Sequence, residues 1–182
     1  MSKNTIILWC TGMSGSGKTT LSSKVKELLI KDGLSTIIID GDEKRGSDNK
    51  KLSFSKEDII ENNLSILNQC KTILLQFDVI FVSVITPYSK IRELIKNDLS
   101  PNCKIIYMKA CLDSLILRDT KGLYKKAKLG VINNLIGYSP SSPYEPPISA
   151  DLVLETDNKD DLNSNIIIFY NFVKKQLDEE YS

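Results

Sequence analysis

The sequence predicts an α/β fold, with a parallel β-sheet of about five strands flanked by helices on both faces. Short runs of β-branched residues alternate along the chain with longer amphipathic stretches, a pattern typical of a parallel sheet covered by helices. The runs 37–39 and 79–82 lack polar alternation, as expected of strands that are buried on both faces. With 182 residues, the chain is expected to form one domain over residues 1–182.

The expected elements follow one another along the chain. Strands are predicted at residues 5–11, 35–40, 78–84, 103–109 and 152–154. Helices are predicted at residues 18–31, about 55–76, 89–97, 112–118 and about 161–177. Gly33 follows the first helix, and Ser55 is the expected N-cap of the second. The polar stretch 41–54 and the basic, then proline-rich stretch 118–147 interrupt this rhythm, and both are expected at the carboxyl ends of strands, where α/β sheets bind ligands.

Composition excludes several kinds of chemistry. The chain has 24 basic and 23 acidic residues, so no overall field would attract nucleic acid or a membrane surface. It has no histidine, which excludes histidine triads and histidine metal sites and leaves a carboxylate as the general base. No apolar run approaches the ~20 residues that cross a bilayer. The four cysteines show no C-x-x-C spacing, so we expect reduced thiols in a cytoplasmic protein. From the balanced charge and the short apolar runs we expect neither nucleic-acid nor membrane partners.

A phosphate-binding motif follows the first predicted strand. The run Gly12-Met13-Ser14-Gly15-Ser16-Gly17-Lys18-Thr19 matches G-x-x-x-x-G-K-[ST] and opens the first predicted helix. Backbone N–H groups of such a loop point at phosphate oxygens, and the helix dipole adds positive potential. Lys18 is expected to reach the β and γ phosphates of ATP, and the Thr19 hydroxyl is expected to hold Mg²⁺. The expected ATP-binding residues of this loop are Gly12, Ser14, Gly15, Ser16, Gly17, Lys18, Thr19 and Thr20.

A pair of carboxylates follows the second predicted strand. Many nucleotide switches carry an aspartate at the end of the strand beside the phosphate loop, but the run after Asp78 continues through Ser83 and Val84 without one. Asp40 and Asp42, separated by Gly41, are the expected substitute. One carboxylate would contact metal-bound water while the other accepts a hydroxyl proton. On its own, this tripeptide also fits a turn capped by aspartate.

A wider set of motifs, in order, supports a kinase. Beside the phosphate loop these are Asp40-Gly41-Asp42-x-x-Arg45, Phe54-Ser55, Glu61-Asn62, Thr86-Pro87-Tyr88, Arg118-Asp119-x-Lys121-Gly122-Leu123-Tyr124-Lys125-Lys126-Ala127 and Pro143-Tyr144-Glu145-x-Pro147. Together they resemble the adenylylsulfate (APS) kinase family over about residues 7–154. The resemblance implies a P-loop kinase with a basic lid at about 118–147. It also implies transfer of the γ-phosphoryl of ATP, with Mg²⁺, to the 3′-hydroxyl of adenosine 5′-phosphosulfate.

The resemblance also implies roles for single residues. Asp42 would be the catalytic carboxylate and, with Thr19, a metal ligand, with Asp40 beside it. Lys121 would neutralise charge on the transferring phosphoryl, and Arg118 would contact ATP from the lid. The implied catalytic set is Asp42, Asp40, Lys18 and Lys121, and the implied acceptor-binding set is Arg45, Phe54, Asn62, Thr86, Lys121 and Leu135.

Departures from the family pattern cluster on the acceptor side. Positions where the family carries arginines hold Ile59, Leu64, Ser65 and Ser89 here, the usual serine before Pro87 is Thr86, and a second base-stacking aromatic is replaced by Leu135. Losing an arginine contact to an anion costs about 1.5–3 kcal/mol, and losing a stacking aromatic about 1–3 kcal/mol. These losses favour a changed acceptor. A similar branch phosphorylates cytidine diphosphoramidate in capsule biosynthesis, and we slightly favour that acceptor over APS.

Other interpretations remain open. One is a nucleotide-binding module with a decayed acceptor site, which would need no general base and no lid lysine. The presence of Asp42 and Lys121 argues against this interpretation. A nucleoside monophosphate kinase has little use for a carboxylate base. The resemblance also implies a possible homodimer, and aliphatic side chains of the long helix, including Ile66, Ile73 and Leu74, would either serve that interface or, as we expect, pack on the sheet.

Overall fold

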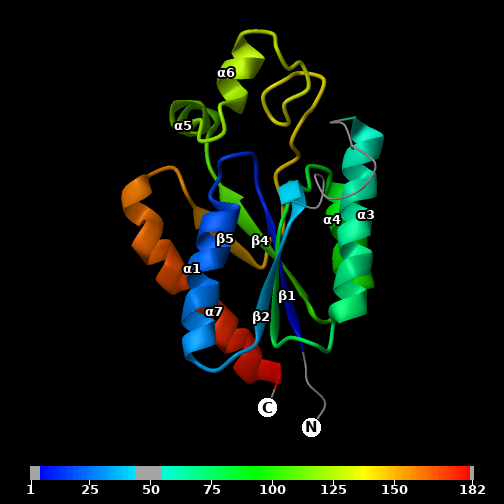
Figure 1. The fold of residues 1–182 in the computed structure, drawn as a ribbon, viewed down its shortest axis with the longest axis vertical. Coiled ribbons are helices and arrows are strands. Elements are labelled where there is room, and N and C mark those ends of the chain that lie inside the picture. The colour runs from blue at the N-terminus through cyan, green and yellow to red at the C-terminus, as the bar shows by residue number, and fades with distance from the viewer. Residues whose placement is uncertain (1–4, 44–54, 181–182) are drawn as a thin grey trace.

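The structure, a computed structural model, describes residues 5–43 and 55–180. Its centre is a five-stranded sheet in the order β2-β3-β1-β4-β5. The central β1 (Ile6–Thr11) pairs with β3 (Val79–Ser83) and β4 (Cys103–Lys109), and the edges are β2 (Thr36–Asp40) and β5 (Leu152–Glu155). Every pairing is parallel, so all carboxyl ends lie at one edge of the sheet (Figure 1). The predicted α/β class is confirmed.

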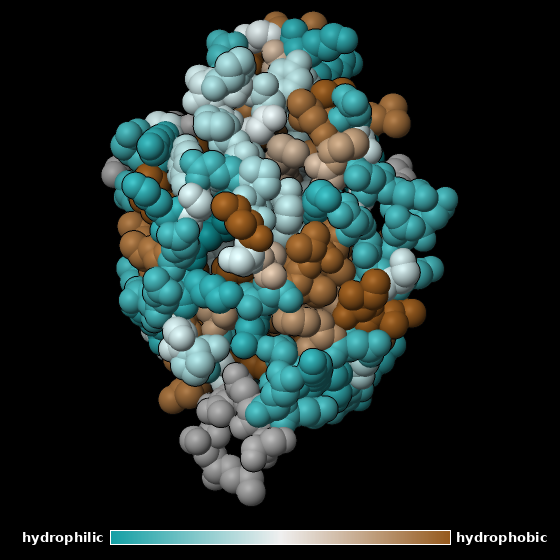
Figure 2. Space-filling view, turned by 180° about the vertical axis from the view of Figure 1, so that it is seen from behind, coloured by the Kyte–Doolittle hydropathy of each residue, from teal (hydrophilic) through white to brown (hydrophobic). Residues whose placement is uncertain are grey.

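Helices cover both faces of this sheet. On one face lie α1 (Lys18–Lys31) and α7 (Leu162–Glu180), and on the other lie α3 (Lys56–Ile73) and α4 (Ser89–Asp98) (Figure 1). The short η1 helix (Lys159–Asp161) leads into α7. Alternate residues of β1 point into the two resulting cores, with Leu8 facing α1 and α7 and Trp9 facing α3 and α4. Seen from behind, the surface is mostly hydrophilic, with hydrophobic side chains gathered in separate patches (Figure 2).

The long helix α3 begins where the sequence predicted. The Ser55 hydroxyl accepts a hydrogen bond from the Asp58 backbone N–H at 3.1 Å, which caps the helix. The helix ends at Ile73, three residues before the predicted end at Gln76, where the chain turns toward β3. Ile66 is fully buried, and Ile73 and Leu74 pack against the same core. These side chains therefore pack on the sheet, as expected.

The predicted basic lid, at about residues 118–147, lies beyond the carboxyl edge of the sheet, at the top of Figure 1. It begins at the end of α5 (Leu112–Arg118), which the sequence predicted, and contains α6 (Leu123–Lys128), which the sequence did not predict. Asp119, with φ at 27°, separates them, and its carboxylate accepts bonds from the backbone N–H groups of Tyr124 and Lys125. The lid has a small core of its own, which Met13 of the phosphate loop joins. No helix in residues 5–43 or 55–180 has both the length and the apolar character needed to span a bilayer.

Candidate active site

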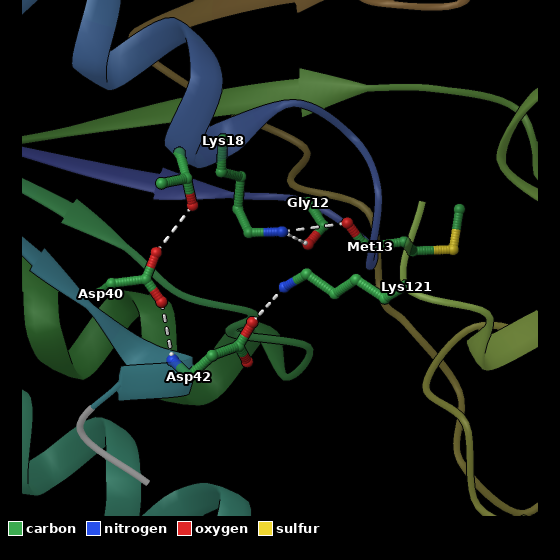
Figure 3. Close-up of polar contacts among 7 residues, drawn as sticks. Gly12, Met13, Lys18, Asp40, Asp42 and Lys121 are labelled. Atoms are coloured by element: carbon green, nitrogen blue, oxygen red, sulfur yellow. Dashed lines mark hydrogen bonds and ion pairs between the residues drawn. The ribbon is translucent and has the colours of Figure 1, made fainter. Parts of the chain in front are cut away.

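The loop between β1 and α1 curls around a buried lysine. Lys18 Nζ donates hydrogen bonds to the carbonyl oxygens of Gly12 at 2.9 Å and Met13 at 3.0 Å (Figure 3). Gly12 cannot carry a side chain, because a Cβ there would lie 2.5 Å from both the Met108 carbonyl and the Ser16 hydroxyl. Burial lowers the pKa of Lys18 to about 8, and nearby Asp42 partly opposes this shift. Lys18 is thus a desolvated cation that donates hydrogen bonds to two backbone carbonyls and lies near the carboxylates of Asp42 and Asp40.

Asp40 connects this loop to the turn after β2. Its carboxylate accepts a bond from the Thr19 hydroxyl at 2.7 Å and another from the Asp42 backbone N–H at 2.8 Å (Figure 3). The turn packs tightly, because a Cβ on Gly41 would lie 2.5 Å from Val84 Cγ2. The main chain at Asp42 is therefore fixed relative to the start of α1.

Asp42 and Lys121 close the other side of the site. Their side chains form an ion pair between the turn after β2 and the lid (Figure 3). Both side chains are more than half exposed, so the pair is open to solvent and can exchange partners. A cavity of about 140 Å³ lies between them and the phosphate loop, lined by Lys18, Thr19, Asp40, Asp42, Thr120 and Lys121 among others. The structure thus brings the four predicted catalytic side chains to one cavity.

A second cavity, of about 270 Å³, adjoins the first across the phosphate loop. Gly15, Gly17 and Thr20 line both cavities. Arg118 forms part of the wall, and its guanidinium donates to the carbonyls of Ser114 at 3.2 Å and Thr156 at 2.8 Å. Its buried Nη2 has no hydrogen-bond partner among the described residues. This arrangement offers a planar cation and a cavity beside the site for phosphates.

The predicted acceptor residues are not all brought together. Asn62 is 1% exposed, and neither polar atom of its amide has a partner in the described part of the chain. Thr86 is fully buried, accepts a bond from Trp9 Nε1 at 2.8 Å and donates one to Asn63 Oδ1 at 2.7 Å, so its side chain faces the core. Leu135 belongs to the core of the lid. Arg45 and Phe54 lie outside the described residues.

The structure places the altered positions in different surroundings. Ile59 is 1% exposed and packs inside the protein. Leu64 and Ser65 line a shallow surface depression on α3 together with Glu57 and Glu61. Sequence reasoning missed Arg92, whose guanidinium donates to the carbonyls of Thr86 and Glu145, both at 2.6 Å. No motif marked Arg92 in the sequence, because its burial and its two carbonyl partners depend on the tertiary fold.

Comparison with known proteins assigns the family. A sequence profile described as adenylylsulphate kinase matches residues 4–155. The chain belongs to this family. It is 41% identical over 154 residues to the adenylyl-sulfate kinase of Oceanobacillus iheyensis. The aligned residues cover 84% of this chain and 76% of that protein. It is 32% identical to the probable adenylyl-sulfate kinase of Aeropyrum pernix, over 95% of this chain and 94% of that protein.

A solved structure agrees with this assignment. The APS kinase CysC of Mycobacterium tuberculosis, in complex with AMPPNP and APS, superposes with a TM-score of 0.84 at 26% identity and covers 94% of this chain and 98% of that one. The predicted P-loop kinase fold and the family resemblance are both confirmed. The chain is a phosphotransferase that uses a hydroxyl group as acceptor, as its family does.

Proposed function

We propose that this protein transfers the γ-phosphoryl group of MgATP to the 3′-hydroxyl of an activated nucleotide, with Asp42 as the general base. The meeting of Asp42 and Lys121 at the mouth of the phosphate loop carries this proposal. In the reaction, the hydroxyl proton passes to the Asp42 carboxylate as the oxygen attacks the γ-phosphorus. The bond from that phosphorus to the bridging oxygen breaks, and ADP leaves with the electron pair.

The two lysines stabilise the charge that develops during transfer. Lys18 exchanges the carbonyls of Gly12 and Met13 for β and γ phosphate oxygens, and Lys121 exchanges Asp42 for the transferring group. The second exchange also releases the Asp42 carboxylate to face the acceptor hydroxyl. The same exchange therefore frees Asp42 to accept a proton and brings Lys121 to the transferring phosphoryl group.

Magnesium fits the oxygen groups at this site. The Thr19 hydroxyl and the carboxylates of Asp40 and Asp42 are hard donors, which Mg²⁺ prefers. Within residues 5–43 and 55–180, no three His, Cys, Asp or Glu side chains could hold a metal by themselves. Bound Mg²⁺ would be held with the help of these oxygen groups and would supply positive charge that neutralises the phosphates of ATP.

Arg118 belongs to the ATP side of the proposed site. The cavity of about 270 Å³ that it lines can receive the adenine of ATP, and its planar guanidinium can stack on the base. The carbonyls of Ser114 and Thr156 hold that plane in place. Asn62 belongs to the acceptor side, because a buried amide without a partner is costly unless a ligand satisfies it.

APS is the first candidate for the acceptor, since the relatives at 32–41% identity carry the name adenylyl-sulfate kinase. A second candidate is cytidine diphosphoramidate. The residue types at positions 59 and 135 favour it, because Ile59 and Leu135 offer neither an arginine nor an aromatic ring to hold a sulfated purine nucleotide. A pyrimidine needs less stacking surface than adenine.

A steady-state comparison of the two acceptors tests this proposal. Purified protein with MgATP is given each acceptor, ADP release is followed, and mass spectrometry identifies the 3′-phosphorylated product. A thousandfold preference, about 4 kcal/mol in transition-state binding, would name the acceptor. Asp42→Asn should abolish transfer, whereas Glu43→Gln, a neighbouring carboxylate outside the cavity lining, should not. MgATP binding without transfer to either nucleotide would instead support a non-catalytic module.

A further inference from the structure

A buried tyrosine connects the lid to the phosphate loop. Tyr124 lies on α6 and is 3% exposed. Its hydroxyl donates a hydrogen bond of 2.9 Å to the backbone carbonyl of Ser14, across 110 positions of sequence. The reaction as described above does not use this contact.

Packing holds the ring of Tyr124 in place, in addition to the hydrogen bond of its hydroxyl. It packs edge-on against Tyr138, with ring centroids 5.9 Å apart and planes at 75°, and it shares the lid core with Ala110, Leu115 and Leu135. Met13, the neighbour of Ser14, packs against the same core. Burial raises the pKa of Tyr124 to about 12, so the hydroxyl remains a protonated donor at neutral pH. The contact is therefore a buried neutral hydrogen bond that solvent does not weaken.

Lys121 lies three residues before Tyr124, and the backbone between them is tightly held. The Asp119 carboxylate accepts bonds from the N–H groups of Tyr124 at 3.0 Å and Lys125 at 2.9 Å. Gly122, with φ at 65°, forms the N-cap of α6 in a left-handed conformation that favours glycine. A displacement of α6 would therefore carry the main chain of Lys121 with it.

We propose that Tyr124 is a positioning residue, which holds α6 on the phosphate loop so that the Lys121 ammonium reaches the transferring phosphoryl group. This inference rests on the proposed role of Lys121 in the transfer. Losing the hydroxyl would leave Lys121 present but displaced. Its contribution to the rate would then fall, while ATP would still bind to the phosphate loop.

The test compares Tyr124→Phe with Tyr138→Phe, which removes a lid hydroxyl for which no hydrogen bond is seen within the described residues. Tyr124→Phe should lower kcat about tenfold and leave the KM for MgATP within about twofold, because the lost interaction acts mainly in the transition state. Tyr138→Phe should leave both constants unchanged. Thermal unfolding of each variant, followed by circular dichroism, shows that the assays are made on folded protein.

A double-variant cycle separates positioning from a structural role. In a Lys121→Ala background, Tyr124→Phe should cause no further loss of kcat, because the lysine through which it acts is gone. A further tenfold loss in that background, or an unchanged kcat in the single variant, would overturn the inference.

A second measurement is independent of the acceptor. Hydrogen exchange of the amides at 121–128 with MgATP bound should be faster in Tyr124→Phe than in wild type and unchanged in Tyr138→Phe. If wild-type protein phosphorylated neither acceptor, the proposed function would fail. Faster exchange in Tyr124→Phe alone would still support the inference that Tyr124 holds α6 on the phosphate loop. Equal exchange in all three proteins would refute it.

Discussion

Lys121 of the lid and Asp42 of the turn after β2 form an ion pair across 79 positions of sequence. Both residues line the cavity that Lys18 also lines. In the proposed reaction, Lys121 leaves Asp42 for the transferring phosphoryl group. On that proposal, the arrival of ATP exposes the Asp42 carboxylate as the general base.

Removal of the lid cation should reduce the rate far more than binding. We expect Lys121→Ala to lower kcat about 10²- to 10³-fold, the usual effect of deleting one group that stabilises transition-state charge. Lys125→Ala removes an exposed lysine from the same lid and serves as the control. Steady-state kinetics with the better acceptor measures both variants, and an equal loss in the two would mean that only the general charge of the lid matters.

The affinity for MgATP should depend on pH through Lys18. Its pKa is lowered to about 8 in the nucleotide-free protein, mainly by burial, whereas bound phosphates favour the charged form and raise it. Binding should therefore take up a proton near pH 8.5, and affinity should fall as the pH rises above about 8. Calorimetry in buffers of different ionisation enthalpy detects the proton. Lys18→Met should bind more weakly and without this slope, and a flat profile in wild type would contradict the prediction.

Two adjacent asparagines should respond in opposite ways to the same substitution. Asn62→Leu removes a buried amide that has no partner among the described residues, so stability should rise or stay level while the KM for the acceptor increases. Asn63→Leu removes bonds to the Ile59 carbonyl and the Thr86 hydroxyl and should lower the free energy of unfolding by about 1–3 kcal/mol. Urea unfolding compares the two. Equal destabilisation would show that Asn62 has a structural partner.

A methyl group at position 41 should displace Asp42, the proposed general base. Gly41→Ala places a Cβ against Val84 Cγ2, and overpacking of this kind typically costs about 1–3 kcal/mol. The displaced turn carries Asp42, so kcat should fall together with the melting temperature. The double variant Gly41→Ala/Val84→Ala relieves the clash and should recover part of the activity lost by Gly41→Ala. No recovery would mean that the turn is held by something other than this contact.

The sequence predicted the fold and the centre of the site because both depend on local patterns. Strand 79–83 and the loop ending at Lys18 follow from β-branched runs and glycine spacing, which need no tertiary information. The six-residue α6 escaped prediction, because it is too short and too basic to show an apolar stripe. Thr86 was expected to face the acceptor, but the indole of Trp9 and the amide of Asn63, both remote in sequence, turn it to the core.

The bond between Trp9 and Thr86 gives the protein a built-in optical reporter. Trp9 is the single tryptophan of the chain, it is fully buried, and its indole N–H donates to the loop that carries Pro87 and Tyr88. Because indole emission responds to hydrogen bonding of its N–H, loss of this bond would shift the emission wavelength. Fluorescence of the unlabelled protein can therefore follow unfolding, in which this buried bond is broken.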